Sequence, residues 1–135
     1  MQIIYNDDEL NSKYIEKINI FQQNISEHPF ILLARPTKNI YENKINQNEF
    51  IQRVEKIIEA GLKFIELPWE ENDNWFTLMQ RLRLKFPNIQ IGSSTIKNKK
   101  SIDDSLHIGL NFSMMRFWDK ELFNYSKENL SLIQI

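Results

Sequence analysis

Two apolar runs in succession each carry a lone polar residue near the C-terminal end, Glu66 in the first and Thr95 in the second. A carboxylate can exchange protons with a ligand, and a hydroxyl can both donate and accept hydrogen bonds. In parallel α/β folds, ligands bind beyond the C-terminal ends of the strands. If both runs are parallel strands, these two side chains therefore mark a binding site.

The elements that would position this site follow from the spacing of apolar residues. Helical spacing predicts an N-terminal helix and four further helices, over 7–24, 47–60, 75–86, 102–108 and 120–128. Short apolar runs predict five strands, over 30–34, 62–67, 89–96, 112–115 and 130–135. Strands and helices alternate, which predicts an α/β fold of repeated βα units with a parallel sheet and right-handed crossovers.

Residues at the element ends support this assignment. Asp7 and Asp8 are candidate caps for the first helix, and Gly61 and Gly109 are suited to end two later ones. The run 30–34 is continuously apolar, as expected of a strand buried on both faces. Since no linker or shift in composition divides the chain, we expect one domain over 1–135.

Composition excludes several classes of function. The 135 residues have a formal net charge of −1, which gives no electrostatic basis for binding nucleic acid. There are no cysteines, so disulfides and thiolate chemistry are excluded. The sequence shows neither a signal peptide nor a membrane span, so we expect a cytoplasmic protein.

Three segments, in their order and spacing, resemble the 2-keto-3-deoxy-6-phosphogluconate/4-hydroxy-2-oxoglutarate aldolases: Ala-Gly-Leu-Lys-Phe-Ile-Glu-Leu-Pro-Trp at 60–69, Phe-Pro-Asn-Ile-Gln-Ile-Gly-Ser-Ser-Thr-Ile at 86–96 and Gly-Leu-Asn-Phe at 109–112. The resemblance runs from about residue 29 to residue 135, with an insertion at 41–47. These enzymes are class I aldolases on a TIM barrel. The resemblance therefore implies a partial TIM barrel, with about five of eight strands, preceded by the N-terminal helix.

The resemblance also implies roles for three residues. Glu66 stands at the position of the family's general acid/base, Thr95 at a threonine that helps to hold the substrate carboxylate, and Arg35 at an arginine that meets an anionic group. All three side chains are expected to line the same opening of the barrel, at the C-terminal ends of the strands. The implied ligand is a small 2-keto acid or its phosphorylated form, with no cofactor and no metal.

Departures from the family pattern are as informative. Glu70 replaces an arginine or asparagine that contacts the anion, Ser94 replaces a glycine, and Met115-Arg116 replaces a Ser-Pro pair. The family's Schiff-base lysine lies on a sixth strand, beyond Ile135, so we expect the chain to be a truncated homologue with little or no activity in isolation. Lys97 is a weak candidate substitute, since the run 97–100 is typical of a solvated turn.

Two functions from different classes remain open. One is an aldolase-like lyase acting on 2-keto acids, and the alternative is a non-catalytic half-barrel remnant or binding and interaction module. An open barrel leaves unpaired strand edges, so we expect either a homo-oligomer or a complementing half-barrel subunit. The N-terminal helix could close one opening. Three neighbouring polar residues, Asp103, Asp104 and His107, are expected to form an exposed helix face rather than a metal site.

Overall fold

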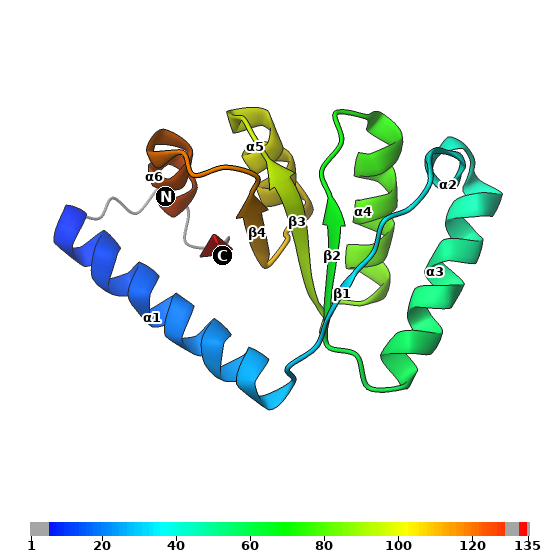
Figure 1. Ribbon diagram of the computed structural model, residues 1–135, viewed down its shortest axis with the longest axis horizontal. Coiled ribbons are helices and arrows are strands. Elements are labelled where there is room, and N and C mark those ends of the chain that lie inside the picture. Colours follow the sequence, from blue (N-terminus) through cyan, green and yellow to red (C-terminus); the bar gives the residue numbers. More distant parts are fainter. Residues whose placement is uncertain (1–5, 129–132, 135) are drawn as a thin grey trace.

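The computed structural model describes residues 6–128 and 133–134 of the chain. Helices and strands alternate along it after an N-terminal helix (Figure 1). In chain order the elements are α1 (Asp7–Glu27), β1 (Ile31–Leu33), α2 (Lys38–Glu42), α3 (Lys44–Glu59), β2 (Phe64–Pro68), α4 (Asp73–Lys85), β3 (Gln90–Ile96), α5 (Lys99–Ile108), β4 (Phe112–Met115), α6 (Lys120–Lys127) and β5 (Ile133–Gln134).

All described strand pairs are parallel, in the order β1-β2-β3-β4-β5. Sequential order is what a run of βα units produces when each crossover places the next strand beside the last. The predicted α/β fold of repeated βα units with a parallel sheet is therefore confirmed. No helix in the described part of the chain has both the length and the apolar character needed to cross a bilayer.

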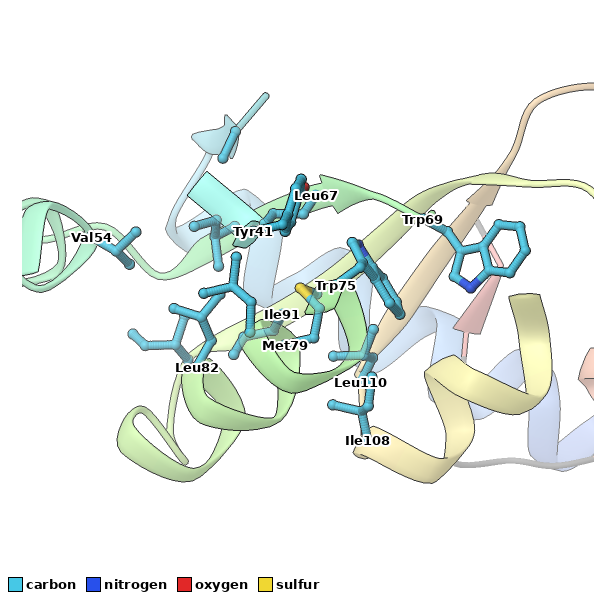
Figure 2. Close-up of a cluster of buried hydrophobic side chains, with 14 of the residues drawn as sticks. Tyr41, Val54, Leu67, Trp69, Trp75, Met79, Leu82, Ile91, Ile108 and Leu110 are labelled. Atoms are coloured by element: carbon cyan, nitrogen blue, oxygen red, sulfur yellow. The ribbon is translucent and has the colours of Figure 1, made fainter. Parts of the chain in front are cut away.

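One face of the sheet is covered by α3, α4 and α5. Ile65, Leu67 and Ile91 of the strands belong to the same buried cluster as helix residues such as Trp75 and Val54. Of the apolar stripe predicted for α4, Trp75, Met79 and Leu82 are fully buried, whereas Phe86 is the C-cap residue and is half-buried. Figure 2 shows part of this cluster, with side chains of α4 directed toward β2 and β3.

The opposite face, here called the inner face, carries Phe64, Glu66, Gly92, Ser94 and Phe112. These residues share it because paired residues of parallel strands point the same way and alternate residues along a strand share a face. Helix α1 crosses this face (Figure 1), and its Phe21 ring meets the rings of Phe64 and Phe112 at centroid distances of 5.7 and 5.4 Å. The N-terminal helix thus covers apolar surface that an open barrel would expose.

The structure differs from the sequence-based expectation in a helix cap, in one additional helix and in the burial of one strand. The cap of α1 is Asn6, whose side chain accepts a hydrogen bond from the Glu9 backbone, so neither expected aspartate is the cap. Helix α2 was not predicted. The expected burial of strand 30–34 on both faces is wrong, because β1 lies at the sheet edge and Leu33 is 53% exposed. Of the predicted strand 130–135, only Ile133–Gln134 lies within the described residues.

Candidate functional site

The structure brings together two of the predicted site residues, Arg35 and Glu66. Arg35 Nη1 donates to Glu66 Oε1 at 3.3 Å and to the carbonyl of Ala34 at 3.2 Å. The Glu66 side chain is completely buried, whereas that of Arg35 is 53% exposed. Arg35 therefore neutralises the buried carboxylate and still presents part of its guanidinium to solvent, where an anion can reach it.

The position of Glu66 follows from the register of β2. Glu66 pairs with Leu33 of β1 and with Gly92 of β3, which places its side chain on the inner face near the C-terminal ends of the strands. Its second oxygen, Oε2, is buried and has no hydrogen-bond partner among the described residues. A carboxylate oxygen in this state is free to accept a hydrogen bond.

Ser94 joins Glu66 on the inner face, although no site role was predicted for it. Its neighbour Ser93 points the other way, with Oγ 2.7 Å from Ser105 Oγ of α5, so alternation directs Ser94 toward the inner face. The Ser94 side chain is buried, and its hydroxyl finds no partner in the described structure. The sequence analysis identified Ser94 only as a departure from the aldolase pattern, which has glycine at this position.

Thr95 adopts an unusual backbone conformation at the end of β3. Its φ of 60° lies in the left-handed region, and the register between β3 and β4 shifts between Ser93 and Ile96. For a β-branched residue this conformation is strained, by about 1–3 kcal/mol. Thr95 is half-buried and makes no hydrogen bond with Arg35 or Glu66 in the described structure. Its role in holding a ligand stays a prediction.

Tyr41 of α2 adds a third buried polar atom close to this end of the sheet. Burial raises the pKa of its phenol, the negative charge of Glu70 raises it further, and the positive charge of Arg35 opposes both. The hydroxyl lacks a partner within the described residues. Arg35 thus pairs with Glu66 and also lies near the phenol of Tyr41, whose ring packs in the buried cluster on the helix side of the sheet.

No described lysine is placed to act as a buried amine. Lys97 follows the last residue of β3, is exposed, and holds its Nζ 5.6 Å from the centre of the Trp69 ring. Trp69 belongs to the helix-side cluster, so Lys97 lies on the side of the sheet away from Glu66. All other described lysines are exposed except Lys127, which is half-buried near Tyr14 and Phe123.

The other charged groups considered from the sequence are engaged elsewhere. Asp104 accepts hydrogen bonds from Trp69 Nε1 and Lys100 Nζ at the edge of a cleft of about 540 Å³ between α4 and α5. Asp103 accepts one from the Tyr125 hydroxyl. Arg116 lies over the Phe117 ring, 5.5 Å from its centre. Asp103 and His107 are exposed as expected, whereas Asp104 is half-buried through its contact with Trp69.

Comparison with known proteins identifies similar folds. No protein-family model matches the chain, and no curated protein matches it in sequence. One similar structure is a crystal structure of KDPG aldolase from Legionella Pneumophila, with pyruvate captured as a covalent carbinolamine intermediate. Its sequence is 15% identical to this chain and its TM-score is 0.63. The match covers 78% of this chain and 46% of the aldolase chain. The native KDPGal structure is 16% identical with a TM-score of 0.61, over 78% and 47%. This chain thus spans about half the length of both structures, and the likeness shows that it has an aldolase-like, partial TIM-barrel fold.

Proposed function

We propose that this chain is an aldolase-like lyase homologue that binds a small 2-keto acid at the C-terminal ends of β1, β2 and β3. The observation that supports this most directly is the pair of Arg35 and Glu66, in which a half-exposed guanidinium lies against a fully buried carboxylate. The fold likeness to an aldolase with bound pyruvate supports the class of ligand.

Each residue of the pair would have a distinct task. The exposed part of the Arg35 guanidinium would bind the ligand carboxylate through charge-assisted hydrogen bonds. Glu66 Oε2 would accept a hydrogen bond or a proton from the atoms next to the keto group, because it is the one carboxylate oxygen not used by Arg35. Thr95 would assist at the carboxylate.

Carbon–carbon bond cleavage is not expected from the described residues alone. A Schiff base requires an unprotonated amine, which proteins obtain by burying a lysine, and none of the described lysines is buried. We therefore propose binding without turnover for this stretch of chain. A lyase reaction would need an amine from another part of the protein or from a complementing half-barrel subunit.

Titration of the protein with pyruvate, followed by NMR or calorimetry, tests the binding site. Arg35→Gln should weaken binding about tenfold or more, because a charge-assisted hydrogen bond contributes about 1.5–3 kcal/mol. Arg116→Gln is the matched control and should leave binding unchanged, since that arginine stacks on Phe117. Absence of pyruvate binding to the unaltered protein would overturn the proposal.

Borohydride reduction in the presence of pyruvate tests the covalent step. A Schiff base would be reduced to a stable secondary amine, and mass spectrometry would detect it as an adduct on one lysine. We expect no adduct. An adduct on any lysine between residues 6 and 128 would show that an exposed amine suffices, and would assign lyase chemistry to this chain.

A further inference from the structure

Two buried polar atoms on the inner face lack a partner within the described residues, Glu66 Oε2 and Ser94 Oγ. Glu66 is 0% exposed and Ser94 8% exposed. An unpartnered buried polar group destabilises the protein, because it has lost its hydrogen bonds to water without gaining others. Two such groups on one face of one sheet therefore point to a bound molecule that satisfies both.

The register fixes how these atoms lie relative to each other. Glu66 pairs with Gly92, and Ser94 is two residues further along β3, opposite Pro68. With about 3.3 Å per residue along a strand and 4.8 Å between strands, the two Cα atoms are roughly 8 Å apart. The side chains do not hydrogen-bond to each other. A ligand group between them would contact both.

We propose that Ser94 is a ligand-binding residue which, with Glu66, binds one hydroxyl group of the ligand. The ligand hydroxyl would donate a hydrogen bond to Glu66 Oε2 and accept one from the Ser94 hydroxyl. A carboxylate can only accept and a serine hydroxyl can donate, so the pair matches a group that does both. This inference rests on the proposed function, in which Arg35 holds the carboxylate of the same molecule.

The inference makes Ser94 a determinant of specificity. The favoured ligand is a small 2-keto acid that carries a hydroxyl group near its keto carbon, and an unsubstituted keto acid leaves both protein atoms unpaired. Sites that hydrogen-bond a ligand hydroxyl discriminate strongly against analogues without it, because the buried partners are then unsatisfied. A glycine at position 94, as in the aldolase pattern, would supply no such donor.

Hydroxypyruvate and pyruvate are suitable probes because they differ by one hydroxyl group. Both are titrated into the unaltered protein, Ser94→Ala and Ser93→Ala. The unaltered protein should bind hydroxypyruvate about tenfold or more tightly than pyruvate, and Ser94→Ala should reduce this preference to about twofold or less. Ser93→Ala is the matched control: its hydroxyl faces Ser105 on the helix side, so the preference should persist.

The possible outcomes separate this inference from the proposed function. Equal binding of the two acids by the unaltered protein, or an equal effect of Ser94→Ala on both, overturns the role of Ser94 and leaves the keto-acid site standing. The second result would mean that Ser94 holds a water or fills space. Failure of both acids to bind overturns the proposed function and the inference with it. Thermal unfolding of each variant verifies that the folds being compared are intact.

Discussion

Thr95 combines a strained backbone with a predicted role in the site, and the two can be separated by substitution. Thr95→Gly removes the steric penalty at φ 60°, because glycine adopts this region freely. Relief of about 1–2 kcal/mol is partly offset by the greater entropy of glycine in the unfolded chain, so a net gain of roughly 0.5–1 kcal/mol in the free energy of unfolding is expected.

The same variant should bind pyruvate more weakly if the Thr95 hydroxyl holds the ligand carboxylate. Denaturant unfolding and ligand titration measure the two effects independently. A gain in stability with unchanged affinity would show that Thr95 affects only the backbone conformation at the bulge of β3 and does not hold the ligand. A loss of stability would contradict the assignment of strain.

Tyr41 predicts a pH dependence of stability. Burial and the charge of Glu70 raise the pKa of its phenol above the ordinary value of 10.0. The neutral form is therefore favoured in the folded state, and its contribution to stability is complete below pH 10.0 and is lost as the pH rises beyond that value. Above this pH, the free energy of unfolding of Tyr41→Phe should fall less steeply with pH than that of the unaltered protein.

At lower pH the same substitution should cost little, because the hydroxyl has no partner among the described residues. Guanidinium-induced unfolding at a series of alkaline pH values, for both proteins, gives the comparison. Parallel curves would show that Tyr41 does not titrate on unfolding in this range.

The residues of the site were only partly predictable from the sequence. Glu66 and Arg35 were found because strand ends and a family resemblance mark them, and the structure places them in contact. Ser94 was missed because its importance depends on which face it points to and on the absence of a partner. Neither is visible without the register of β2 and β3. The left-handed Thr95 also breaks the simple alternation of side-chain direction along β3.

At the scale of elements, the close approach of β3 and β4 depends on Gly92. A Cβ built there would lie 2.2 Å from the Phe112 ring, which is itself fully buried. Gly92→Ala should therefore destabilise the protein by about 1–3 kcal/mol or more through overpacking. Chemical denaturation measures this directly.

A second substitution provides the control for Gly92. Phe112→Leu removes ring atoms that the new methyl group would strike, so the double variant should be less destabilised than the sum of the two single ones. Strict additivity would mean that another contact, and not the Phe112 ring, requires glycine at this position.

Elements with strong periodicity were predicted well, and those defined by tertiary context were not. The stripe of α4 and the glycine after α5 are local signals, and Gly109 indeed adopts a φ of 83° at that helix end. Helix α2 has only five residues and no apolar period to reveal it. Leu33 shares the inner face with its register partner Glu66, and its exposure depends on how much of that face other elements cover, which no local pattern encodes.

At the scale of the molecule, the packing of α1 explains how part of a barrel can be covered. Phe21 closes the lower part of the inner face against Phe64 and Phe112. The polar half, with Glu66 and Ser94, lies further toward the strand ends. The apolar half of the face is thus used for folding, and the polar half carries the residues of the proposed ligand site.

The exposed edge of the sheet predicts that the chain self-associates. Strand β1 ends the sheet order, and Leu33 and Phe30 beside it are 53% and 77% exposed. An exposed apolar edge strand favours pairing with another chain. We expect a homo-oligomer at micromolar concentration, detected as a doubled or higher mass by light scattering.

Leu33→Lys should shift the population toward the monomer, because a charge on an edge strand opposes pairing. Leu84→Lys is the matched control: Leu84 is 82% exposed on α4, away from the edge, so the variant adds the same charge without touching β1. If both variants dissociate the oligomer equally, net charge and not the edge controls association. If the unaltered protein is a monomer, the prediction is wrong, and the exposed residues at the edge do not require a second copy of the chain to cover them.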